Sequence, residues 1–82
     1  MKKVGTVTHY YGKIGVAIIK LSSTLKVGDR IKIENGAEFE QAVDSMQIEH
    51  APVEEAKKGD VVGLKVGQKA SEGATVYLAE EE

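Results

Sequence analysis

Apolar and polar residues alternate along most of the chain with the two-residue period of β-strands. The clearest example follows residues 25–29, where Ile31 and Ile33 face one side of a strand and Arg30 and Lys32 face the other. Such a strand is expected to bury one face and to expose the other to water.

A Gly-Asp pair begins this strand at Gly28-Asp29, and a second pair at Gly59-Asp60 begins another apolar strand. Glycine supplies the backbone freedom that a tight turn often needs, and aspartate bonds to neighbouring backbone groups. Two such turns, each followed by an apolar strand, indicate a small closed β-structure.

Six segments have the composition of strands, and they are residues 3–10, 14–21, 30–34, 38–50, 60–66 and 74–79. The second is apolar on both faces, which is typical of a strand that is covered on both sides or curls tightly in a barrel. The predicted inward residues are Val7, Val16, Ile18, Ile31, Ile33, Val43, Ile48, Val62, Leu64, Val76 and Leu78.

Two irregularities are expected. Apolar parity changes within residues 38–50, which predicts a β-bulge near Asp44-Ser45. Pro52 and the acids and lysines after it predict one short helical turn that ends at Gly59. Asn35-Gly36 predicts a hairpin.

The fold class predicted from this pattern is all-β, a small closed six-stranded barrel with one short helical turn. Residues 1–82 are read as one domain, in which residues 80–82 form a frayed tail. The chain has no cysteine, so disulfides or thiolate metal sites cannot supplement its core. It lacks the long apolar runs of a signal peptide or a membrane span, so no membrane contact and a cytoplasmic location are expected.

The net charge of −2 is unevenly distributed. Residues 1–34 carry seven Lys and Arg against two acids, and residues 35–82 carry four Lys against eleven acids. This asymmetry is compatible with a surface for an anionic partner, and equally with the charged outer faces that strands require.

No motif for catalysis or for a cofactor is apparent. The run from Gly5 to Gly12-Lys13 has the wrong spacing for a phosphate-binding loop and lacks its hydroxyl residue, so nucleotide binding is not expected. His9, His50 and Glu49 would form a metal site only if the fold brought them together, and the prediction is no metal, no cofactor and no enzymatic activity.

The run His9-Tyr10-Tyr11-Gly12-Lys13 has two readings. Consecutive tyrosines in a strand point to opposite faces, so an exposed one beside Lys13 is able to stack on a base while the lysine meets a phosphate. Alternatively, the tyrosines cover the end of a barrel.

Residues 25–33 and 56–64, in this order and spacing, resemble the second domain of translational GTPases such as elongation factor Tu, and the similarity extends from Val4 to Leu78. Residues 45–50 and 8–11 are more similar to a narrower group. This group comprises free-standing elongation-factor-like proteins and the C-terminal domain of collagenase-like peptidases.

The resemblance implies a six-stranded barrel that binds ribosomal or transfer RNA without catalysis. Residues 12–16, Ala17-Ile18 and Glu49-His50 depart from the pattern of elongation factor Tu, so its aminoacyl pocket is not carried over. With no GTPase domain in the sequence, the expected role is that of an isolated binding module.

The leading expectation is therefore RNA or ribosome binding through seven residues. They are His9, Tyr10, Tyr11, Lys13, Lys26, Arg30 and Lys32. The alternative is a protein-docking module, equivalent to the C-terminal accessory domain of a collagenase-like peptidase, whose partner is a peptidase-like enzyme.

Overall fold

The computed structural model describes residues 2–35, 37–49 and 51–79, and all regular structure in these residues is β-strand. The strands are β1 (Lys2–Tyr11), β2 (Val16–Leu21), β3 (Leu25–Lys26), β4 (Arg30–Asn35), β5 (Ala37–Ala42), β6 (Met46–Ile48), β7 (Ala51–Val53), β8 (Glu55–Ala56), β9 (Val61–Lys65) and β10 (Thr75–Leu78). Gly36, predicted as part of a turn, and the predicted tail of residues 80–82 lie outside the described residues.

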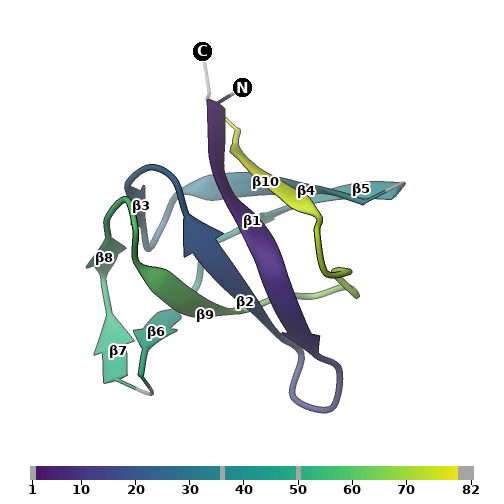
Figure 1. Ribbon diagram of the computed structural model, residues 1–82, viewed down its shortest axis with the longest axis horizontal. Coiled ribbons are helices and arrows are strands. Elements are labelled where there is room, and N and C mark those ends of the chain that lie inside the picture. The colour runs from purple at the N-terminus through teal and green to yellow at the C-terminus, as the bar shows by residue number, and fades with distance from the viewer. Residues whose placement is uncertain (1, 36, 50, 80–82) are drawn as a thin grey trace.

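Eight of these strands form one antiparallel sheet in the order β5-β4-β10-β1-β2-β9-β6-β7. The sheet curls around its own inner face, and the short pair β3 and β8 lies at one side of it (Figure 1). This confirms the all-β class and a barrel-like shape. The closed six-stranded form is wrong, because β5 and β7 are end strands of the sheet.

The core lies on the inner face of the curled sheet and is built from Val, Ile, Leu, Ala and Met side chains. Of the predicted inward residues, seven are fully buried, namely Val7, Ile31, Ile33, Val43, Val62, Leu64 and Val76. Ile48 and Leu78 are half-buried and pack against this core.

The prediction of which residues of β2 point into the core is wrong. Ala17, Ile19 and Leu21 point into the core, whereas Val16 and Ile18 are only half-buried. The cause is the register with β9, in which Ile19 lies opposite Val62. Residues directly opposite each other in an antiparallel pair share a face, so the inward side chains of β9 determine which side of β2 is buried.

The predicted helical turn after Pro52 is also wrong, because the chain there forms β7 and β8. β7 pairs with β6, and β8 pairs with β3 through Leu25 and Ala56, both of which are buried. Burial of Ala56 against Leu25 outweighs the weak local helix preference of a short charged segment. Proline is tolerated because β7 is an end strand of the sheet.

Residues 38–50 do not form one bulged strand. The chain leaves its pairing with β4 at Ala42, crosses through residues 43–45 and begins β6, which pairs with β9. Val43 is buried in this crossing and exchanges backbone hydrogen bonds with Gly28 and Asp29. The parity change in the sequence thus marks a change of neighbouring strand.

A single side chain connects the end of β5 to the end of β9. The amide of Gln41 donates to the carbonyl of Lys65 at 2.9 Å and accepts from the Gly67 N–H at 2.9 Å. An amide side chain can replace a backbone unit in this way because it carries both a donor and an acceptor.

Candidate functional site

Two of the predicted RNA-binding residues are held in ion pairs on the outer face of β4 and β5. Lys32 Nζ lies 2.9 Å from Glu38 Oε1 and 3.7 Å from Glu34 Oε2, and Arg30 Nε lies 3.1 Å from Glu40 Oε1. The five side chains carry two positive and three negative charges, so this face does not present a basic surface to phosphate.

The electrostatics of the pair Lys32 and Glu38 agree with this pairing. The hydrogen bond from Lys32 lowers the pKa of the Glu38 carboxyl from its ordinary value of 4.5, and burial opposes the shift. The same hydrogen bond raises the pKa of Lys32 above 10.5. Both groups therefore stay charged over a wider pH range than they would alone.

The other predicted residues lie on separate elements. Tyr10 packs against the core, and Lys13 is exposed in the turn after β1. Lys26 is exposed on β3, outside the main sheet. The seven residues thus do not gather around one surface, since β10 also separates β4 from β1.

His9 and Tyr11 are the predicted residues that the fold does bring together. Their rings are tilted by 60° with centroids 4.3 Å apart, and His9 Nδ1 lies 2.8 Å from Glu72 Oε2. His9 therefore connects Tyr11 to the loop before β10 and restricts the position of an aromatic ring that is 48% exposed.

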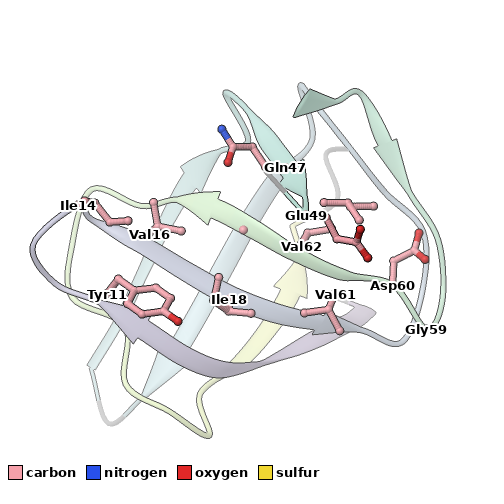
Figure 2. A pocket seen from close by; sticks show the side chains of 12 residues that line it. Tyr11, Ile14, Val16, Ile18, Gln47, Glu49, Gly59, Asp60, Val61 and Val62 are labelled. Carbon is pink, nitrogen blue, oxygen red and sulfur yellow. The ribbon is translucent and has the colours of Figure 1, made fainter. Parts of the chain in front are cut away.

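Tyr11 lines a groove of about 550 Å³ on the outer face of the sheet. We call it the outer groove. Figure 2 shows Tyr11 and Ile14 at one end, and Asp60 and Glu49 at the other. The other lining residues are Val16, Ile18, Gln47, Ile48, Gly59, Val61, Val62 and Gly63.

The floor of the outer groove is Gly63 of β9, which lies opposite Ile18 on one side and Gln47 on the other. A methyl group placed on Gly63 would lie 3.5 Å from Val16 Cγ1 and 3.6 Å from Ile18 Cδ1. These are ordinary van der Waals distances, so the missing side chain leaves open space over two apolar neighbours.

One end of the outer groove is built by the second Gly-Asp turn. Gly59 has φ 92°, and Asp60 Oδ2 accepts the Lys57 N–H at 2.9 Å. The first turn repeats this arrangement, because Gly28 has φ 99° and Asp29 Oδ2 accepts the Lys26 N–H at 3.0 Å. The two turns share one geometry, but Asp60 alone of the two aspartates lines the groove.

Glu49 reaches the same end from the turn after β6. Its φ is 52°, in the left-handed region, and it is the one non-glycine residue with positive φ in the described part of the chain. A side chain in this region costs roughly 1–3 kcal/mol, and such strain is concentrated at functional positions.

Sequence reasoning found Tyr11 but missed the rest of the outer groove. Two features of the sequence could have indicated the groove. Residues 14–21 are apolar on both faces, and Gly63 lies inside the strand predicted at residues 60–66. Val16 and Ile18 were predicted to lie in the core, because the sequence does not specify which face of β2 lies on the same side as the inward residues of β9.

The arrangement can bind but offers no evident chemistry. The residues that line the outer groove include no Ser, Thr, Cys, His, Lys or Arg. Within residues 2–35, 37–49 and 51–79, no three His, Cys, Asp or Glu residues gather as metal ligands, and His50 lies outside this part. In the same residues no helix is long and apolar enough to cross a membrane.

The fold is also found in solved structures of another protein domain. Two crystal structures of the C-terminal domain of a putative U32 peptidase from Geobacillus thermoleovorans match the chain with TM-scores of 0.90 and 0.91. The matches cover 94% and 96% of this chain and 99% and 93% of the crystallised domains, at 17% sequence identity. At this identity the likeness concerns the fold alone.

A likeness in sequence adds to it. The chain is 44% identical over 81 residues to a part of an uncharacterized protease of Methanocaldococcus jannaschii, and this match covers 96% of the chain. The chain spans about a fifth of that protein, since the match covers 20% of it. No family model matches the chain.

These comparisons correct the leading interpretation from sequence. Similar proteins are a protease and peptidase C-terminal domains, and neither an elongation factor nor an RNA-binding protein. Arg30 and Lys32, two of the four cations expected to contact phosphate, are paired with Glu40 and Glu38. The predicted resemblance to the C-terminal domain of collagenase-like peptidases agrees with these comparisons. The predicted resemblance to the second domain of elongation factor Tu is not supported by them.

Proposed function

We propose that residues 1–82 form one protein-docking domain, without catalysis of its own, that serves a peptidase-like protein. The observation that carries this proposal is the 44% identity between nearly the whole chain and a fifth of a protease. A segment of that size beside a much larger remainder is typical of an accessory domain.

The outer groove supports the same proposal. Three large apolar side chains with exposed fractions of 48%, 63% and 47%, namely Tyr11, Ile14 and Val61, surround it. Contiguous exposed apolar residues on a small domain are typical of interaction sites. A lining that is mainly apolar and holds no Ser, Thr, Cys or His favours binding over catalysis.

The partner is proposed to be the larger part of a peptidase-like protein, and the Methanocaldococcus jannaschii relative allows a direct test. The relative is produced without the fifth that resembles this chain and is titrated with the 82-residue protein in a calorimeter. We expect a one-to-one complex with a dissociation constant in the micromolar range.

The intact relative is the matched control. Its own similar segment should already occupy the contact surface, so the 82-residue protein should bind it much more weakly. Equal binding to both forms, or no heat with the shortened form at concentrations well above micromolar, would contradict the proposed function.

A further inference from the structure

The outer groove is apolar along its length and acidic at one end. Glu49 and Asp60 are the charged residues among those that line it, and Figure 2 shows both at the end opposite Tyr11 and Ile14. The strand register agrees with this picture, because Gln47 lies opposite Gly63, which brings the following turn of β6 towards the start of β9.

The backbone holds the Asp60 carboxylate in place, and Glu49 has a distinctive backbone conformation beside it. Asp60 Oδ2 accepts the Lys57 N–H, and Asp60 N donates to the Lys57 carbonyl at 2.9 Å, which fixes the turn. Glu49 directly follows β6 and has φ 52°, in the left-handed region. The Asp60 carboxylate is already fixed, so it loses little conformational freedom when a cation approaches, and two carboxylates at one end of the groove favour a positive charge there.

The length of the groove limits what can lie in it. Along β9, five residue steps separate Lys65, opposite Val16, from Asp60. At about 3.3–3.4 Å per step this is about 17 Å, and Ile14 extends the apolar part further. An extended peptide of about six or seven residues fits such a length.

We propose that the outer groove receives a short extended segment of a partner protein, with apolar side chains over Gly63 and a lysine or arginine between Glu49 and Asp60. This inference rests on the proposed docking function and adds the site and the chemistry of its partner. Apolar contacts supply affinity, and the paired charges determine the direction in which the segment lies.

The test uses a blocked seven-residue peptide of alternating leucine and serine that ends in lysine, and the same peptide ending in glutamate. Each is titrated into the 82-residue protein, and amide shifts are followed by NMR. We expect shifts around residues 11–18, 47–49 and 59–63, and about fivefold tighter binding of the lysine peptide, as for a favourable surface ion pair.

Asp60→Asn and Asp29→Asn form a matched pair of variants. Each keeps an oxygen that can accept the turn hydrogen bond, but only Asp60 lines the groove. We expect Asp60→Asn combined with Glu49→Gln to abolish the preference for lysine, and Asp29→Asn to leave it unchanged. Gly63→Leu, which fills the floor, should weaken both peptides at least tenfold.

Three results would overturn the inference: no shifts at these residues, an equal affinity for both peptides, or shifts that depend on protein concentration without peptide. The last result would mean that a second copy of the chain occupies the groove. If the shortened protease binds the wild-type protein and Gly63→Leu equally well, the groove inference fails while the proposed function stands. If the lysine peptide binds in the groove but the shortened protease does not bind, the proposed function fails while the groove remains a peptide-binding site.

Discussion

The outer faces of two parts of the same sheet differ in chemistry. On β4 and β5 the outward side chains are charged and paired, with Lys32 between Glu34 and Glu38 and Arg30 beside Glu40. On β2 and β9 the outward residues Val16, Ile18, Val61 and Gly63 line the outer groove, whereas the outward Lys20 and Lys65 do not line it.

The difference indicates what each face contacts. Charged residues along an end strand such as β5 keep other chains from pairing with it. Two of the three outward residues of β2, Val16 and Ile18, are apolar although Ala17, Ile19 and Leu21 already fill the inner side. An apolar surface that folding does not require is best explained by a partner.

The largest expected effect separates the two faces of β2. Ile19→Ala removes a fully buried side chain and should lower the free energy of unfolding by about 2–5 kcal/mol, a large part of the total for a small domain. Ile18→Ala removes a half-buried side chain and should cost about 1 kcal/mol. Urea denaturation followed by circular dichroism measures both.

Equal destabilisation by Ile19→Ala and Ile18→Ala would contradict the distinction between the inner and outer faces of β2. Ile18 would then belong to the core, and the outer groove would be a consequence of folding. We also expect Ile18→Ala, and not a conservative change on β5, to weaken binding of the shortened protease.

A second prediction uses two glycines that lie inside strands. A methyl group on Gly5 would lie 2.8 Å from Ile19 Cγ2 and 2.8 Å from the Lys20 carbonyl, so Gly5→Ala should destabilise the fold by about 1–3 kcal/mol through overpacking. Gly63→Ala meets only ordinary contacts and should stabilise the strand by about 0.5–1 kcal/mol.

Gly63→Ala is informative because stability and binding should move in opposite directions. The added methyl group fills the floor of the outer groove, so affinity for the shortened protease should fall while the urea midpoint rises. A fall in both would show that Gly63 is needed for the fold rather than for a partner.

Glu49→Asn tests the strain at the acidic end of the groove. Asparagine tolerates positive φ in a two-residue hairpin turn better than glutamate does, so we expect a gain of about 1 kcal/mol in thermal or urea unfolding. Binding of a lysine-containing segment should weaken, since one carboxylate is lost. An unchanged or lower stability would mean that the Glu49 side chain contributes contacts that outweigh its backbone strain.

Much of the fold could be predicted from the sequence. Ile31 and Ile33 alternate with Arg30, Lys32 and Glu34, so one face only can be the core, and both isoleucines are buried. β2 lacks this contrast, and which of its faces is buried depends on a strand 43 residues away, in the pair of Ile19 with Val62.

Short strands were missed for another reason. β7 and β8 have two or three residues each and exist because of pairing with β6 and β3, which local composition does not reveal. The prediction of the RNA-binding site failed for the same reason, because it considered residues 1–34 without their neighbours in space. Residues 1–34 do carry a net positive charge, but Lys32 and Arg30 pair with Glu38 and Glu40 from the next strand.

The smallest effect concerns pH and the charged face. The pKa of Glu38 is lowered in the folded protein, so its ion pair with Lys32 stabilises the fold above about pH 4.5 and this contribution is lost as the pH falls through the folded pKa. The pKa of Lys32 is raised, so the contribution is present below about pH 10.5 and is lost as the pH rises through its folded value.

Glu38→Gln should therefore lower the urea midpoint slightly between pH 5 and pH 10, and this effect should disappear at a pH low enough to protonate Glu38 in the folded wild-type protein. Glu55→Gln, on β8, changes the net charge equally and is the matched control, expected to show no such window. Neither variant should alter binding of the shortened protease, because both lie away from the outer groove. A clear loss of binding in Glu38→Gln would move the docking surface to β4 and β5 and would remove the distinction between the two outer faces.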